Sequence, residues 1–118
     1  MKTKAGNLRR TMIINLSLLI LTVILWGCTK PGSTQLGPNE VLIQGYAFTP
    51  GSITVTANTT ITWTNKDGVP HTVTSDSGAF DSGTINTNGT YSHTFTSAGT
   101  YHYHCTVHPA MTATVIAN

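Results

Sequence analysis

The chain has 118 residues, enough for one domain, and a formal net charge of +2. Four of its six basic residues lie within the first ten positions, and from Thr29 onward two lysines face four acidic residues, a net charge of −2. A weakly acidic body offers no basic surface to a nucleic acid, so the charge pattern excludes a nucleic-acid partner.

The first 28 residues have the three parts of an export signal. Basic residues precede an apolar run from Met12 to Leu25, and the segment ends in Leu25-Trp26-Gly27-Cys28. The run is short for a membrane-spanning helix and suits the core of a signal peptide. Its ending resembles a bacterial lipobox, which implies cleavage before Cys28 and lipidation of that residue. The alternative is an uncleaved anchor helix, and both interpretations place the domain outside the cytoplasm (periplasm or cell surface), attached to a membrane.

Residues 29–39 predict a flexible linker. They contain two prolines and two glycines with almost no apolar side chain, so they have little to pack against a core. The chain therefore divides into a signal or anchor segment (1–28), this linker (29–39) and one domain (40–118). Beyond Cys28 the only cysteine is Cys105, so no disulfide is expected.

Alternating apolar and polar residues predict an all-β domain. In the stretch 60–64, for example, Ile61 and Trp63 share one face and threonines occupy the other. No stretch of the domain has the 3.6-residue period of a helix, and turn residues separate the alternating segments. The result is a two-sheet β-sandwich, which alternation alone does not distinguish from an immunoglobulin-like domain. The expected strands include 52–56, 60–64, 90–96 and 112–117.

A further strand is expected in the first part of the run of residues 101–111. Tyr101, Tyr103 and Cys105 have the same parity, so they point to one side of this strand. We expect the two tyrosines to enter the core and Cys105 to face the interior at the strand's end. His102 and His104 point the other way.

Three potential metal ligands follow at equal spacing, namely Cys105, His108 and Met111. Thiolate, imidazole and thioether suit copper better than a hard cation, whereas a structural zinc site normally uses more Cys or His and no Met. His71, which follows Pro70 after a turn, is the best candidate for a fourth ligand from a neighbouring loop. The pattern predicts a mononuclear copper site.

These motifs resemble those of the cupredoxins, the small blue copper proteins, especially the amicyanin- and plastocyanin-like members. The resemblance covers about residues 46–117 and implies a Greek-key sandwich fold. It also implies that His71, Cys105 and His108 are in-plane copper ligands and that Met111 is a weak axial ligand. The segments that carry it are Ala47-Phe48-Thr49-Pro50, Ile61-Thr62-Trp63-Thr64-Asn65, Pro70-His71, Ala98-Gly99-Thr100-Tyr101 and the short Cys-x2-His-x2-Met loop.

The resemblance also implies roles for residues around the ligands. In many family members an Asn follows the first ligand His and braces the ligand loop, but here Thr72 has that place, and Thr106 follows Cys105. Because such bonds tune a metal, we expect the reduction potential and the loop rigidity to differ from those of Asn-bearing relatives. The electron-transfer surface implied by the family consists of His108 with Pro70, Pro109 and Ala110, and His104 is a second candidate exit.

The expected function is transfer of single electrons between redox protein partners at the outer face of a membrane, by a monomer. The alternative is a chaperone or storage lipoprotein that delivers copper to an oxidase. An enzyme is not expected. Multicopper oxidases have His on both sides of the ligand Cys, whereas here His104 precedes Cys105 but Thr106 follows it.

Overall fold

A computed structural model describes residues 36–118, which form eight strands and contain no helix. The predicted signal or anchor segment, Cys28 and the linker as far as residue 35 lie outside the described residues. Within residues 36–118, no helix has the length and apolar character needed to cross a membrane. The strands are β1 (Glu40–Ile43), β2 (Phe48–Thr49), β3 (Ser52–Val55), β4 (Thr59–Asn65), β5 (Thr74–Ser75), β6 (Thr90–Phe95), β7 (Gly99–His104) and β8 (Thr112–Ala117).

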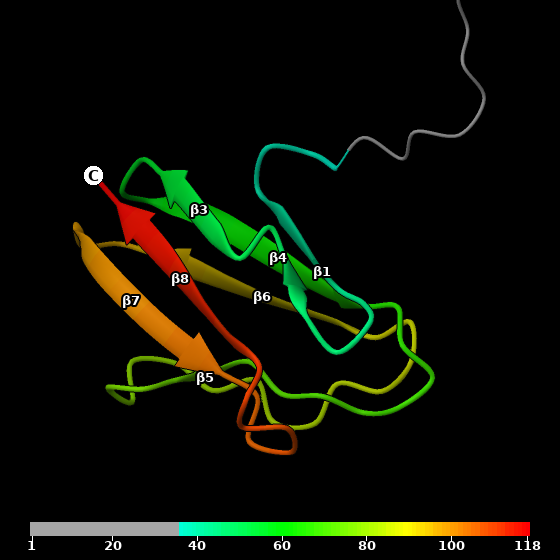
Figure 1. The fold of residues 1–118 in the computed structure, drawn as a ribbon. Helices are drawn as coiled ribbons and strands as arrows, with labels where there is room; N and C mark the ends of the chain where they lie inside the picture. Colours follow the sequence, from blue (N-terminus) through cyan, green and yellow to red (C-terminus); the bar gives the residue numbers. More distant parts are fainter. Residues whose placement is uncertain (1–35) are drawn as a thin grey trace, which may run out of the picture. The chain divides into compact units, whose positions relative to one another are not determined.

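The strands form two four-stranded sheets, ordered β2-β1-β4-β6 and β3-β8-β7-β5 (Figure 1). The predicted two-sheet sandwich is confirmed. Each sheet is mixed, because β1 pairs with β4 and β3 pairs with β8 in parallel, while the other pairs are antiparallel. A parallel pair needs a crossover connection rather than a hairpin. Between β1 and β4 the chain passes through β3 in the opposite sheet, which alternation within single strands does not indicate.

The alternation predicted from the sequence decides which side chains meet between the sheets. Ile61 and Trp63 of β4 are fully buried, and Ala113, Val115 and Ala117 of β8 are at most 7% exposed. Apolar area removed from water in this way stabilises the fold by roughly 25 cal/mol per Å². Threonine and serine hydroxyls pair across the outer face of β4 and β6, at 2.7 and 2.8 Å.

A buried hydrogen bond joins the two sheets close to the end of β7, two residues before Cys105. Trp63 on β4 donates its indole N–H to the hydroxyl of Tyr103 on β7, with an Nε1–Oη distance of 3.1 Å. Burial raises the pKa of Tyr103 to about 12, although the bond from Trp63 acts in the opposite direction, so the hydroxyl stays neutral. Tyr103 is 1% exposed and Cys105 is fully buried, which confirms the predicted inward parity of β7.

We predict that Tyr103→Phe lowers the free energy of unfolding of the copper-free protein by about 1–3 kcal/mol. The variant leaves the buried N–H of Trp63 without an acceptor, which costs about that amount. Urea unfolding followed by tryptophan fluorescence measures the change. The matched control is Tyr91→Phe, which removes a hydroxyl from a half-buried tyrosine on the inward face of β6. Equal losses in the two variants would contradict the assignment.

The packing of the His93 ring on β6 predicts that the free energy of unfolding depends on pH. Its ring packs against Phe80 and Phe95, with centroids 4.9 and 4.8 Å away, and burial lowers its pKa below the ordinary value of 6.5. As the pH falls through about 6.5, the unfolded chain takes up this proton before the folded protein does. The contribution is therefore stabilising at higher pH and is lost on acidification.

We expect His93→Gln to reduce the loss of stability between about pH 7.5 and about pH 5.5. The measurement is urea unfolding of the copper-free variant and the parent protein across that range. Because the comparison is between slopes, a constant effect of the substitution on packing does not affect it. A variant with the parent's slope would show that His93 makes no such contribution.

Candidate metal centre

His71 lies on the segment between β4 and β5 and is fully buried. Its backbone pairs with that of Ile85 in an isolated antiparallel bridge, with N–O distances of 3.1 and 2.8 Å. Two bonds to a segment 14 residues away hold the backbone of His71 outside any regular strand. The imidazole therefore starts from a fixed position at this end of the sandwich.

Asn65, the last residue of β4, organises the turn that leads to His71. Its side chain is fully buried, and its amide group donates to the carbonyl oxygens of Val69 and Ile85 at 2.8 and 2.9 Å. Its Oδ1 accepts the backbone N–H of Asp67 at 2.9 Å. Sequence reasoning missed this role. The available signal was a polar residue at an inward-facing position, two residues after Trp63, because buried polar groups need hydrogen-bond partners.

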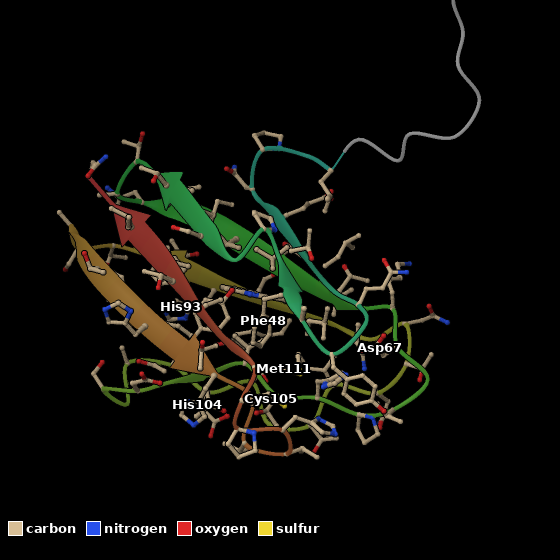
Figure 2. All side chains as sticks on the ribbon, in the orientation of Figure 1. Phe48, Asp67, His93, His104, Cys105 and Met111 are labelled. Atoms are coloured by element: carbon tan, nitrogen blue, oxygen red, sulfur yellow. The ribbon has the colours of Figure 1, made fainter. Side chains whose placement is uncertain are left out.

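The loop Cys105–Met111 connects β7 to β8 and closes on itself (Figure 1). Cys105 donates its backbone N–H to the carbonyl of Met111 at 3.1 Å, and Met111 donates to the carbonyl of His108 at 2.9 Å. Met111 is 6% exposed, and Figure 2 shows it beside Cys105. The short loop therefore brings together the backbones of the three residues predicted from their spacing.

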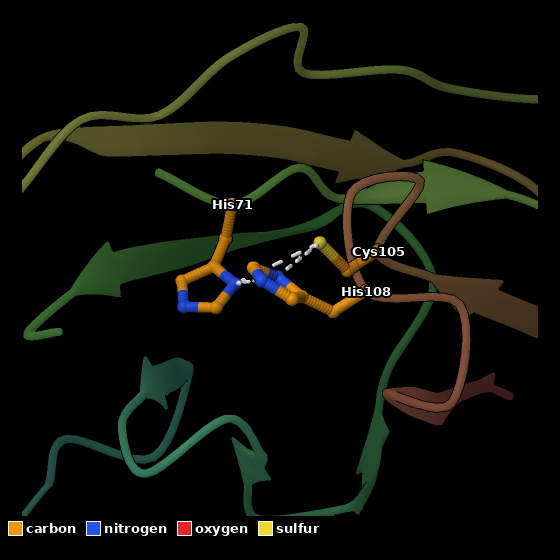
Figure 3. A group of neighbouring side chains, drawn as sticks. All are labelled: His71, Cys105 and His108. Carbon is orange, nitrogen blue, oxygen red and sulfur yellow. Dashed lines mark hydrogen bonds between the residues drawn. The ribbon is translucent and has the colours of Figure 1, made fainter. Parts of the chain in front are cut away.

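His71, Cys105 and His108 direct one donor atom each toward a common point (Figure 3). The two Nδ1 atoms are 3.2 Å apart, and Cys105 Sγ lies 3.7 Å from that of His71 and 3.8 Å from that of His108. The circumcentre of this triangle lies about 2.1 Å from each atom, close to the roughly 2.0–2.3 Å that nitrogen and sulfur ligands keep from zinc, an ion of copper's size. The donor set and its spacing fit one metal ion.

Asp67 determines which nitrogen of His71 is free for a metal. The other ring nitrogen, Nε2, lies 2.9 Å from Asp67 Oδ2, and a carboxylate oxygen only accepts, so Nε2 carries the proton. Nδ1 then presents its lone pair to the donor triangle. The pKa of Asp67 is lowered. Burial alone would raise it, but N–H bonds from Tyr46 and Gly45 and the interaction with His71 outweigh burial.

Thr72 and Thr106 connect the two segments that carry the donors. The backbone N–H of Thr106 donates to Thr72 Oγ1 at 2.8 Å, and the two hydroxyl oxygens are 3.1 Å apart. The backbone N–H of Thr72 points at Cys105 Sγ, 3.3 Å away. A threonine hydroxyl therefore reaches the ligand loop from the position where many cupredoxins have an asparagine.

The residues predicted for the electron-transfer surface are more exposed than the two buried donors, His71 and Cys105. Pro70, Pro109 and Ala110 are exposed, and His108 is partly exposed. His104 points to the outer face of β7, where its Nδ1 lies 2.6 Å from an oxygen of Asp76 (Figure 2). It is not one of the three residues that form the donor triangle.

Sequence reasoning also missed Tyr46 and Asp67. Asp67 lies in the turn before His71, and its local pattern does not indicate a contact with the ring of that residue. Nothing in the local pattern of Tyr46 indicates that its ring lies edge-on to His71 and His108, with centroids 5.6 and 5.0 Å away. These contacts join segments more than 20 residues apart, so a local pattern does not reveal them.

We predict that Thr72→Ala destabilises the copper-free protein by about 1–3 kcal/mol, because the N–H of Thr106 loses its acceptor. Hydrogen exchange of the Thr106 amide should accelerate along with this loss. Thr72→Ser keeps the Oγ and is the matched control, so it should retain most of the protection. If both variants exchange as slowly as the parent, the hydroxyl does not brace the loop.

The chain is similar in sequence and in fold to known proteins. The model of the cupredoxin-like domain matches residues 17–117. Amicyanin-alpha of Methylorubrum extorquens is 35% identical over 85 residues, which cover 68% of this chain and 71% of that protein. Plastocyanin of Scenedesmus fuscus is 38% identical over 72 residues, covering 52% and 74%.

Solved structures give the same result. The Cu(I) form of an amicyanin mutant superposes with a TM-score of 0.66 at 32% identity, covering 73% of this chain and 87% of that one. A purple cupredoxin from Nitrosopumilus maritimus superposes with a TM-score of 0.62 at 29% identity, covering 67% and 98%. The resemblance noted from the sequence is therefore confirmed, and the chain belongs to the family of cupredoxin-like domains.

Proposed function

We propose that this chain is a type 1 (blue) copper protein that carries single electrons between redox protein partners. The observation that supports this most directly is the triangle of two imidazole nitrogens and one thiol sulfur with sides of 3.2, 3.7 and 3.8 Å. Two His and one Cys with a weak axial Met is the donor set of electron-transfer copper sites. The family relationship to amicyanin and plastocyanin agrees with this assignment.

His71, Cys105 and His108 would hold the copper ion, and Met111 would be its weak fourth ligand. Burial of Met111 at the end of a loop whose backbone returns to Cys105 supports its assignment as that fourth ligand. When bound, copper supplies a one-electron Cu(I)/Cu(II) couple. A combination of soft and nitrogen donors suits both oxidation states, so neither state requires a different set of residues.

The protein itself holds these donors in fixed positions and shields them from water. His71 and Cys105 are fully buried, so water has little access to the thiolate. The backbone N–H of Thr72 points at Cys105 Sγ from 3.3 Å and helps to fix the position of the sulfur. Donors fixed in this way need little rearrangement when an electron arrives or leaves.

Electrons are proposed to enter and leave through His108, which is the partly exposed member of the donor set. Pro70, Pro109 and Ala110 supply exposed, uncharged surface beside it, where a partner protein can approach. His104, which adjoins Cys105 along the chain and reaches the outer face of β7, remains the proposed second exit.

A carrier of electrons fits the structure better than a carrier of copper. Delivery of copper favours an exposed, exchangeable site, whereas two of the donors here are fully buried. No enzymatic activity is proposed, because the relatives of this chain include the electron carriers amicyanin and plastocyanin.

We further propose that the domain works as a monomer outside the cytoplasm, at the outer face of a membrane. The support is the sequence of residues 1–28, in which a basic stretch and an apolar run end at Cys28. Lipidation of Cys28, or retention of the run as an anchor, would hold the domain there, and residues 29–39 would let it move between partners.

We predict that the oxidised, copper-loaded protein has an intense visible band from thiolate-to-copper charge transfer and titrates as a one-electron couple. Cys105→Ser should lose the band, because the thiolate is its source. Cys28→Ser is the matched control and should keep it. Absorption spectroscopy and a redox titration make the measurement. A copper-loaded parent protein without colour would contradict the assignment of a type 1 copper site. Rapid loss of copper to a chelator would favour the alternative function, a copper chaperone.

A further inference from the structure

The carboxylate of Asp67 joins two turns that are far apart in the sequence. Its Oδ1 accepts the backbone N–H of Gly45 at 2.7 Å, and its Oδ2 accepts the backbone N–H of Tyr46 at 3.0 Å. The same Oδ2 accepts the Nε2–H of His71 at 2.9 Å. One side chain therefore fastens the turn between β1 and β2 to a member of the donor triangle.

Asp67 is itself held in place on both sides. Its backbone N–H donates to the buried Asn65, and its backbone carbonyl accepts the hydroxyl of Thr87 at 2.8 Å. The carboxylate thus meets its three donors from a fixed starting point, and its side chain is 13% exposed. Charge-assisted bonds of this kind are stronger than neutral ones.

These hydrogen bonds also fix the position of Tyr46 next to His71 and His108. Its φ of +58° is unfavourable for a residue with a Cβ, so surrounding contacts must hold it there. Its ring stands nearly perpendicular to both imidazoles, at 85° to His71 and 87° to His108. Tyr46 as a whole is 54% exposed, so it lies at the surface beside these imidazoles rather than within the core.

We propose that Asp67 is a positioning residue with two linked tasks. It keeps His71 in the tautomer whose Nδ1 faces the donor triangle, and it fastens Tyr46 as a cover over the two imidazoles. Tyr46 then limits the access of water and competing ligands to the site. The effect on copper rests on the function proposed above, whereas the clamp itself exists in the copper-free protein.

The first test uses the copper-free full-length protein and the variant Asp67→Asn. The amide nitrogen of the introduced asparagine cannot accept a hydrogen bond, so one or more of the N–H groups of Gly45, Tyr46 and His71 loses its acceptor. We expect faster amide exchange at Gly45 and Tyr46 and a changed NMR signal for the His71 Nε2 proton. The control Glu40→Gln makes the same chemical change at a carboxylate that accepts the N–H of Gly37, at the start of β1. It should leave these signals unchanged.

The second test measures copper affinity and the rate of copper transfer to a chelator. Asp67→Asn should weaken affinity by about tenfold to a hundredfold, the usual effect of removing a bond to a ligand histidine. Tyr46→Gly, which tolerates the positive φ, should speed transfer, while Tyr46→Phe keeps the ring and should not. In the Asp67→Asn background, Tyr46→Gly should increase the rate of copper transfer by a smaller factor than it does in the parent protein, because Asp67→Asn already loosens Tyr46.

Unchanged exchange and affinity in Asp67→Asn would overturn the clamp, and strictly additive effects of the two substitutions would overturn the link to Tyr46. Failure of the parent protein to form a blue copper site would count against the proposed function only. The exchange test on copper-free protein would still decide whether Asp67 holds the turn and His71.

Discussion

Burying the imidazole of His71 is the constraint on which the site depends. A buried polar group needs partners for its hydrogen-bonding atoms, and an imidazole has two such atoms, which point in different directions. Asp67 satisfies Nε2, and Nδ1 faces the sulfur of Cys105 and the ring of His108. Because each nitrogen has its own surroundings, the ring has one favoured orientation and one favoured tautomer. The donor triangle is thus prepared by hydrogen bonding before any ion arrives.

Side chains replace regular secondary structure in the segment that carries His71. Between β4 and β5 the backbone has few ladder bonds, and Asn65 supplies a substitute by bonding three backbone groups of the surrounding loops. Thr72 extends the same principle to the ligand loop through the N–H of Thr106. No buried side-chain nitrogen or oxygen among the described residues lacks a hydrogen-bond partner, as expected for such a polar network.

The two sheets also contribute to the site, because their packing fixes the position and direction of Cys105. Trp63 and Tyr103 join the sheets through a buried bond, and the parity of β7 then delivers Cys105 to the interior two residues further on. A large aromatic contact between sheets resists sliding, because interiors are closely packed. The sulfur consequently occupies a fixed position relative to the loop from which His71 comes. Fold and site share this core, so a disturbance of either affects the donor geometry.

The sequence by itself determined five of the eight strands and the donor types. Alternation placed Ile61, Trp63 and Cys105 on inward faces, and the spacing of Cys, His and Met in one loop indicated the metal site, because both signals act within a few residues. Only the tertiary structure decided the parallel strand pairs, the reach of Thr72 to the ligand loop and the bridge from Asp67 to Tyr46. The contact of Thr72 with Thr106 spans 34 positions, that of Asp67 with Tyr46 spans 21, and the β3–β8 partners are 62 positions apart. Their existence depends on how the sheets cross over and on which loops meet at one end, and local periodicity carries no information about either.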